Sequence, residues 1–390
     1  LKVERWLRDP HAVQPSPPRM ALVSCRFAIV GSGGSCSLPN LRHVLQPEAR
    51  CPVCLDALSN PGSKNCRGNP CLLVSARRAD GSCEHVLVDC GKTFEQAVRS
   101  HFPRLGVQGL SAVVLTHGHA DAILGLDSLR EVQLAREPPD VWTLQAKTPL
   151  FASATTIKEA WHHFHYMFPP GFYEAAEVAK GTSFSGQPTL RRRASRSRIV
   201  GGLCPREIRE FRPFCPIKGL QVRPLPVLHG GNYVCLGFVF GVRGEFVYLS
   251  DVSEVPENTM EVLRECAAEV LVVDSLLKSG SNYSHFGLQQ ALELVRRLRP
   301  RRTLLIGMSC QFDHDRDNKE LRELSAEGLQ VELSYDGLCL DLELTAAADG
   351  DFCSSDEEEQ SDEGPRPGEL PPEPRGEAPA CWTRLTRAAR

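Results

Sequence analysis

The chain has 390 residues, with 45 Lys and Arg against 48 Asp and Glu, a formal net charge of −3 and 42% hydrophobic residues. This balance gives no overall positive field, which argues against nucleic acid as a partner. No apolar run approaches the roughly 18 residues of a membrane-spanning helix, and no secretory signal opens the chain. We therefore expect a cytoplasmic protein without a membrane segment. Because the chain begins at Leu1, organelle targeting stays open, and so does the oligomeric state.

The composition divides the chain into a globular part and two polar ends. Residues 1–20 contain Pro and Arg without periodicity, and residues 346–390 combine an acidic run with a Pro-rich stretch, so both ends are expected to be disordered. The part between them, 21–345, is predicted to be a single domain. Within it, the basic and aperiodic segment 181–202 is expected to be a surface insertion.

Short apolar runs alternate with helical patterns through this domain. The expected strands cover 25–30, 71–75, 85–89, 112–115, 220–228, 235–240, 246–249, 270–273, 303–306, 331–334 and 338–344. The expected helices cover 94–101, 122–131, 155–164, 257–267, 288–298 and 316–327. This alternation predicts a mixed α/β fold.

The strongest chemical signal is a His-x-His-x-Asp motif directly after the expected strand at 112–115. Two imidazoles two residues apart, His117 and His119, can point at one ion from the end of a strand. The carboxylate in the next turn, Asp121, can face a neighbouring ion. The motif therefore predicts a metal centre rather than two unrelated surface histidines.

Further residues of the types that bind metals follow in order. His229 and Asp251 each come directly after an expected strand, and His285 precedes an expected helix. Side chains at strand ends are held by a rigid sheet, as a preorganised metal centre requires. We therefore expect these three residues to join the motif.

Taken in order, these motifs resemble those of the metallo-β-lactamase superfamily. Within it they resemble the phosphonate-pathway cyclic phosphodiesterases, with ribonuclease Z more distant. The motifs are VGSG at 30–33, LVDCG at 87–91, THGHAD at 116–121, PLPVLHG at 224–230, YLSD at 248–251, SHFG at 284–287 and LIGM at 305–308. The resemblance covers about 27–344 and implies a four-layer αββα sandwich, with the metal centre in a cleft at one edge of the two sheets.

The resemblance also implies which residues hold which ion. By the matching positions, the first zinc or manganese ion is held by His117, His119 and His229, and the second by Asp121, with Asp251 bridging the two. It further implies that His285, which matches the family's cleft histidine, protonates the leaving oxygen or stabilises its charge. Asp121 would orient or deprotonate the attacking water.

Two departures from the family pattern affect the second ion. The family usually carries a second His after the Asp, where this chain has Ala122, and a further His after a late strand, where it has Gly307. We therefore expect the second ion to be weakly bound or absent. His314 follows shortly after this position and is either a replacement ligand or a surface histidine.

A second cluster is predicted to be structural. Cys51 and Cys54 form a CxxC pair, the spacing that lets two thiolates share a tetrahedral zinc. The resembling phosphodiesterases hold a structural zinc near the amino end, and the matching positions here are His43 and Cys310. Cys66 is a reserve ligand, and unrelated thiols are the alternative. A redox CxxC is disfavoured because no thioredoxin-like βαβ pattern surrounds the pair.

The sequence therefore predicts a metal-dependent hydrolase, a phosphodiesterase that uses a metal-bound hydroxide on a small cyclic or nucleotide-like phosphodiester. One alternative is a catalytically degenerate binding protein with the same fold, suggested by the two missing ligands. A second is a redox enzyme with a mononuclear iron held by two histidines and a carboxylate.

Overall fold

The computed structural model describes residues 22–46, 51–133, 135–136, 143–144, 147–169, 172 and 201–346. The expected extension at 1–20, the insertion up to residue 200 and the tail from residue 347 lie outside these ranges. None of the helices in the described ranges is long and apolar enough to cross a membrane.

The first sheet contains seven strands in the order β15-β1-β2-β3-β4-β7-β8. Pairing is antiparallel from β15 to β3 and parallel from β3 to β8. Its strands are β1 (Leu22–Gly31), β2 (Cys71–Arg78), β3 (Cys83–Val88), β4 (Ala112–Val114), β7 (Thr148–Ala152), β8 (Leu203–Glu207) and β15 (Leu338–Leu342).

The second sheet contains six strands in the order β14-β13-β12-β11-β10-β9. Pairing is antiparallel from β9 to β11 and parallel from β11 to β14. Its strands are β9 (Val222–Leu228), β10 (Val234–Phe240), β11 (Phe246–Leu249), β12 (Val270–Asp274), β13 (Arg302–Ile306) and β14 (Val331–Leu333). A separate two-stranded ribbon pairs β5 (Ala135–Arg136) with β6 (Thr143–Leu144).

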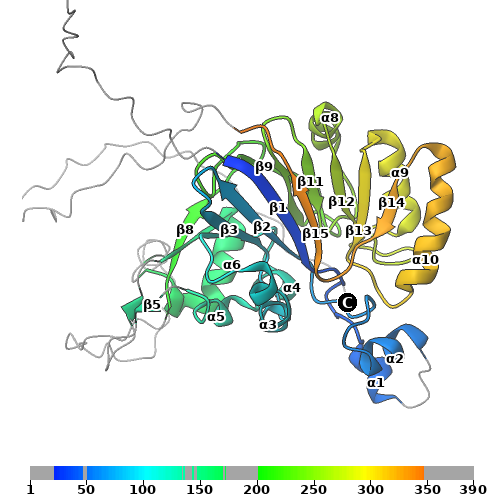
Figure 1. The fold of residues 1–390 in the computed structure, drawn as a ribbon, viewed down its shortest axis with the longest axis horizontal. Helices are drawn as coiled ribbons and strands as arrows, with labels where there is room; N and C mark the ends of the chain where they lie inside the picture. Colours follow the sequence, from blue (N-terminus) through cyan, green and yellow to red (C-terminus); the bar gives the residue numbers. More distant parts are fainter. Residues whose placement is uncertain are drawn as a thin grey trace, which may run out of the picture. The chain divides into compact units, whose positions relative to one another are not determined.

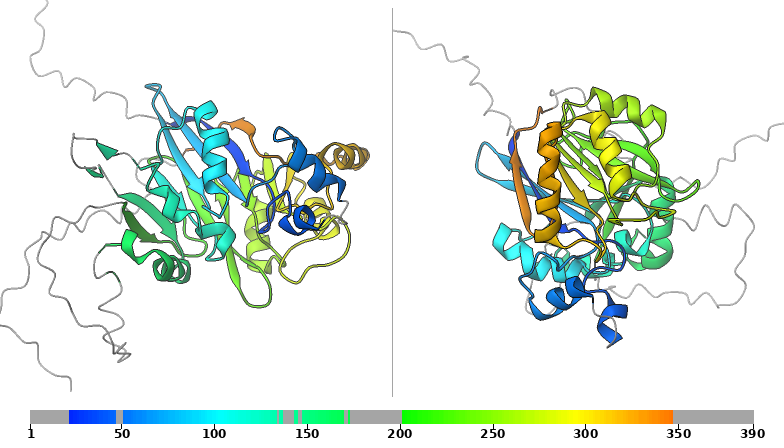
Figure 2. Two further views of the ribbon diagram at one scale, coloured as in Figure 1. Left: turned by 90° about the horizontal axis from the view of Figure 1, so that it is seen from below. Right: turned by 90° about the vertical axis from the view of Figure 1, so that its right-hand side faces the viewer.

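Helices cover the outer faces of both sheets, as Figures 1 and 2 show. Those beside the first sheet are α3 (Phe94–Leu105), α4 (Ala120–Ile123), α5 (Leu126–Leu129) and α6 (Ala154–Phe164), followed by a 3-10 turn η1 (His165–Met167). Those beside the second are α8 (Glu257–Glu265), α9 (Leu288–Leu298) and α10 (His314–Leu321), with η2 (Arg322–Glu327). Two more, α1 (Leu41–Leu45) and α2 (Pro52–Ser59), project from the loop after β1.

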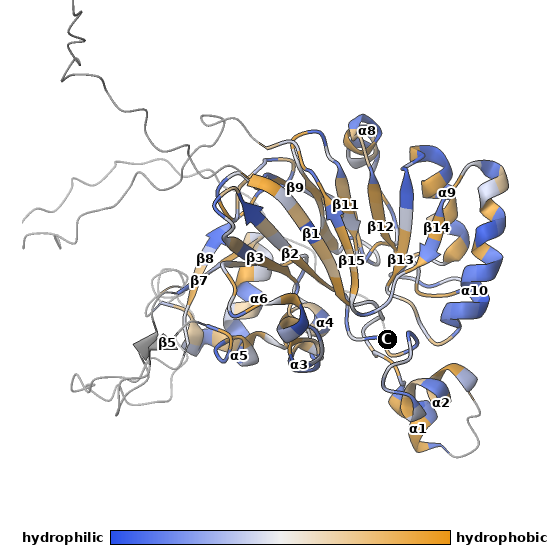
Figure 3. Cartoon of the chain, in the orientation of Figure 1, coloured by the Kyte–Doolittle hydropathy of each residue, from blue (hydrophilic) through white to orange (hydrophobic). Residues whose placement is uncertain are grey.

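Three hydrophobic cores identify the four layers. One lies between the sheets, where the rings of Phe27 in β1 and Phe246 in β11 stack with centroids 3.9 Å apart. A second packs the first sheet against α3–α6, and a third packs the second sheet against α8–α10. The apolar colouring of the strands in Figure 3 follows this arrangement. The predicted αββα sandwich is therefore confirmed, because each sheet buries both of its faces.

Several elements of the structure differ from the prediction. The single helix expected at 122–131 is wrong, because the chain breaks into α4 and α5 at Gly125, where a Cβ atom would lie 2.3 Å from Gly91 O. Strands β7 and β8 were not expected; in β8 only Leu203 is fully buried, so this strand carries no continuous apolar signal. The short helices α1 and α2 were also not expected.

Candidate metal centre

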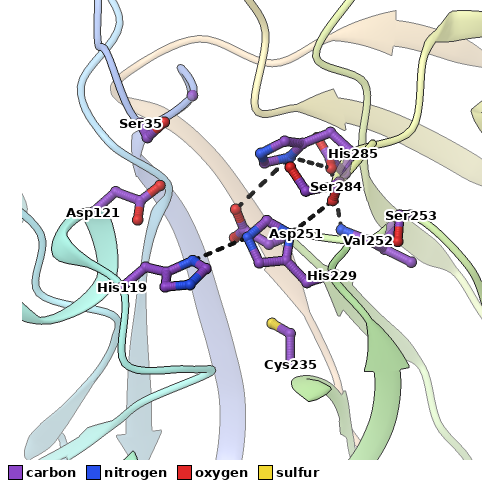
Figure 4. A network of polar contacts seen from close by, with 12 residues as sticks. Ser35, His119, Asp121, His229, Cys235, Asp251, Val252, Ser253, Ser284 and His285 are labelled. Carbon is purple, nitrogen blue, oxygen red and sulfur yellow. Dashed lines mark hydrogen bonds and ion pairs between the residues drawn. The ribbon is translucent and has the colours of Figure 1, made fainter. Parts of the chain in front are cut away.

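The ends of β4 and β9 bring three histidines together. His117 and His119 follow β4, and His229 follows β9. Their side chains offer ligand atoms that all lie within 4.8 Å of one another. Figure 4 shows His119 and His229 turned toward each other, with Asp251 behind them. The structure thus unites the three residues that the sequence predicts for the first ion.

A chain of hydrogen bonds prepares His117 for metal binding. Asp89 Oδ2 accepts the hydroxyl proton of Thr116 at 2.9 Å, and Thr116 Oγ1 lies 2.8 Å from His117 Nδ1. Because that hydroxyl donates to the carboxylate, it accepts from Nδ1–H. The other nitrogen, Nε2, is buried and has no hydrogen-bond partner in the described part of the chain. Burial lowers the pKa of His117 to about 3, so the ring is neutral and presents a lone pair.

His229 is fixed in the same way, through its Nδ1 atom. Its Nδ1 lies 2.7 Å from the carbonyl oxygen of Ser284, which can only accept, so Nδ1 carries the proton. Its Nε2 lies 3.2 Å from His119 Nδ1. Two nitrogens on a tetrahedral zinc, with bonds of about 2.0–2.1 Å, are about 3.3 Å apart. The histidine group therefore has the donor atoms and the spacing that one zinc ion requires.

Two carboxylates lie beside this group. Asp251, which follows β11, has Oδ1 4.0 Å from His285 Nδ1 and forms a second candidate ligand group with His229 and His285. Asp121, in α4, has Oδ1 3.9 Å from His117 Nε2. Both are buried. Each carboxylate is close enough to serve either as a further ligand of an ion held by the histidines or as a group that orients water beside it.

His285 pairs with a carboxylate that the sequence analysis did not select. Its Nδ1 lies 2.7 Å from Oδ2 of Asp274, the last residue of β12. Burial acts to lower the pKa of His285, but the hydrogen bond to Asp274 and the charges of Asp274 and Asp251 outweigh burial and raise it to about 9. Burial raises the pKa of Asp274 to about 7, against the effect of His285. The pair therefore keeps His285 protonated at neutral pH.

The residues beside Asp121 do not fit a second ion held in the family manner. Ala122 offers only a methyl group and Gly307 has no side chain. A Cβ atom at Gly307 would lie 2.5 Å from Asp274 Oδ1, so the buried carboxylate of Asp274 leaves no room for a side chain at this position. Positions 122 and 307 therefore supply no side-chain ligand for a second ion.

His314 does not reach the metal centre. It starts α10, its Nε2 lies 3.2 Å from Asn318 Nδ2, and its ring packs edge-on against Tyr335. The expectation that it replaces a missing ligand is corrected. Asn65, in the segment between α2 and β2, fixes its backbone, because His314 N donates to Asn65 Oδ1 at 2.9 Å.

The structure also unites all four residues of the predicted structural cluster: His43, Cys51, Cys54 and Cys310. His43 Nδ1 lies 3.4 Å from Cys54 Sγ and 3.5 Å from Cys310 Sγ. A sulfur and a nitrogen on a tetrahedral zinc, with Zn–S of about 2.3 Å, are about 3.6 Å apart. Cys66 lies apart, with its thiol donating to Ala57 O. The donor set therefore fits one structural zinc.

Sequence reasoning missed the partners of the ligands. Asp89 lies in the LVDCG motif and Asp274 ends a strand just as Asp251 does, so the signal for both was a carboxylate at a strand end. Tyr233 was also missed. Its ring stacks on His119 with centroids 4.6 Å apart, and its hydroxyl accepts from Gly118 N at 3.2 Å. This contact holds the loop that carries the motif.

Comparisons with known proteins agree with this geometry. A family model described as "Beta-lactamase superfamily domain" matches residues 84–308, more than half of the chain. An octanoyltransferase from Porphyromonas gingivalis (strain ATCC BAA-308 / W83) is 24% identical over 313 residues, which cover 80% of this chain and 51% of that relative. The chain thus spans about half the length of this relative.

Solved structures show the same fold. A diphosphatase from the PhnP family is 25% identical, with a TM-score of 0.60 over 83% of this chain and 100% of that chain. Zn²⁺-bound PqqB from Methylobacterium extorquens is 18% identical, with a TM-score of 0.55 over 81% of this chain and 100% of that chain.

Proposed function

We propose that this chain, which belongs to the metallo-β-lactamase superfamily, is a metal-dependent hydrolase that cleaves a small phosphodiester. The observation that carries the proposal is the three-histidine group beside the His285–Asp274 pair. A metal site alone would also suit a binding protein. A protonated histidine held by a carboxylate next to that site can act as a general acid on the leaving oxygen of an ester, which a binding protein does not need.

Under this proposal, the catalytic ion is zinc or manganese. It is held by His117, His119 and His229, with Asp251 beside them. A bound divalent cation supplies a Lewis acid that polarises a phosphoryl oxygen and lowers the pKa of water. Cys51, Cys54, Cys310 and His43 hold a structural zinc. The similarity to a diphosphatase of the PhnP family supports phosphate ester chemistry.

The chain's own residues supply the proton transfers. Asp274 fixes the His285 ring through Nδ1, which leaves Nε2 to donate a proton to the leaving oxygen. Asp121 lies on the side of His117, where its carboxylate accepts a hydrogen bond from the attacking water. In-line attack would place the water and the leaving oxygen on opposite sides of phosphorus, and we assign Asp121 to the water and His285 to the leaving oxygen.

Steady-state hydrolysis of bis(4-nitrophenyl) phosphate by zinc- and manganese-loaded protein tests the proposal. We expect turnover that Asp251→Ala abolishes and that His285→Ala lowers by about 10²–10⁴-fold. Turnover that both variants retain would refute the site assignment. Metal-loaded protein without turnover would favour a binding protein, and bound iron without hydrolysis would favour a redox enzyme.

A further inference from the structure

Tyr283 presents an aromatic ring at the edge of the metal centre. Its side chain is 79% exposed, whereas His285, two residues later, is buried. The residue between them, Ser284, accepts the Nδ1 hydrogen bond of His229 through its carbonyl oxygen. The ring is therefore attached to a segment whose next two residues, Ser284 and His285, contact residues of the metal centre.

The turn that follows His229 forms a seat for this ring. Gly230 and Gly231 have φ values of +85° and +55°. A Cβ atom on Gly230 would lie 3.1 Å from Tyr283 Cε1, and one on Gly231 would lie 2.4 Å from Tyr283 Oη. Side chains at these two positions would thus be strained and would displace the ring. Backbone supports one side of the ring, and its large exposed area leaves the other side free.

The surroundings of the ring are polar. Asn232 is exposed beside the glycine turn. Asn282 uses its Oδ1 to accept from Ser284 N at 2.9 Å and from Ser284 Oγ at 3.2 Å, which leaves its amide N–H groups as donors. Amides beside an aromatic face suit a flat, hydrogen-bonding ring. An alkyl chain would instead require an apolar groove.

We infer that Tyr283 is a stacking platform for a planar base, and that the substrate is a nucleoside phosphodiester rather than a simple alkyl ester. The inference rests on the proposed function, because it assumes that phosphorus is held at the histidine group. Every nucleobase has a π-face, and stacking on an aromatic side chain strengthens binding by about 5- to 100-fold per base. Tyr283 is thus a specificity residue, because its ring contacts the base and not the reacting phosphorus.

The kinetic test compares three esters with the same 4-nitrophenyl leaving group, namely the thymidine 5′, octyl and methyl 4-nitrophenyl phosphates. We expect zinc-loaded protein to prefer the thymidine ester over the methyl ester by about 5- to 100-fold in kcat/KM. Tyr283→Ala should remove this preference and Tyr283→Phe should keep it. Tyr166→Ala, which removes another exposed tyrosine, is the matched control and should keep it too.

A preference that survives Tyr283→Ala would overturn the inference, and so would an equal gain for the octyl ester. Binding of thymidine 5′-monophosphate and methyl phosphate, measured by calorimetry, provides a readout without turnover. A binding preference that depends on Tyr283 in a protein without turnover would support the platform and refute the hydrolase. Turnover of the thymidine and methyl esters at equal rates would support the hydrolase and refute the platform. Neither turnover nor a binding preference would refute both.

Discussion

Asp274 Oδ2 lies 2.7 Å from His285 Nδ1, so the last residue of a buried strand holds the ring of the proposed proton donor. The same oxygen accepts from Val252 N at 3.1 Å. One carboxylate oxygen of Asp274 thereby binds both the backbone after Asp251 and the imidazole ring of His285. Asp274 therefore connects the backbone beside the proposed metal site to the proposed proton donor.

Asp274→Asn tests whether this carboxylate positions His285. The amide keeps the shape of the side chain but removes its charge, so we expect kcat to fall, by less than the about 10²–10⁴-fold loss for His285→Ala. Zinc content and KM should stay close to wild type, and the basic limb of the pH–rate profile should move to lower pH. An unchanged profile would contradict a positioning role for Asp274.

Thr116→Val tests the hydrogen-bond chain from Asp89 to His117. Without the hydroxyl, His117 Nδ1 loses its acceptor, and we expect zinc affinity at the histidine group to fall by about 10–100-fold. Competition with a chromophoric chelator measures this affinity. The matched control is Thr259→Val, which removes a buried hydroxyl that donates to Pro226 O. Equal zinc affinity in both variants would show that the chain does not orient the ligand.

Cys310→Ser tests the structural zinc. Losing one thiolate from four ligands should release that zinc and lower the Tm, because structural metal binding contributes directly to folding free energy. Cobalt-loaded protein should also lose thiolate charge-transfer absorption. Cys204→Ser, in β8 and outside the cluster, should keep the zinc, the absorption and the Tm. If Cys310→Ser retained the full zinc content, the cluster would not be a metal site.

His314 predicts a pH dependence of stability. Burial, with the charges of Lys64 and Arg67, lowers its pKa to about 4 in the folded chain, against about 6.5 when unfolded. Between these values the unfolded state binds more protons, so the free energy of unfolding should fall as the pH is lowered from about 6.5 to 4. Denaturant unfolding of metal-free protein at several pH values measures this. His314→Asn should show a shallower dependence, and equal slopes would contradict it.

The sequence predicted the positions of most strands and the candidate ligands near their ends. Apolar runs located most strands because burial on both faces leaves a continuous signal. The candidate ligands followed, because His117, His229 and Asp251 each come within three residues of the end of such a strand. The resemblance to the phosphodiesterases, rather than local sequence, linked His43 to Cys310, which are 267 positions apart.

Three features could not be predicted, for physical reasons. The role of Asp274 depends on the register of β12 against the loop that carries His285, which local sequence does not encode. The ring of His314 points to Asn318, and Asn65, in the segment between α2 and β2, fixes its backbone. Tyr283 has no sequence pattern of its own, since its seat is the turn after His229, far away in the chain.

The most direct test of the central claim is a zinc titration of metal-free protein in which bound zinc and phosphodiester turnover are measured on the same samples. We predict that turnover reaches its plateau at about two zinc ions per chain, one at the histidine group and one at the cysteine cluster. A plateau that requires a third ion would contradict the single catalytic ion. No turnover at any zinc loading would contradict the hydrolase itself.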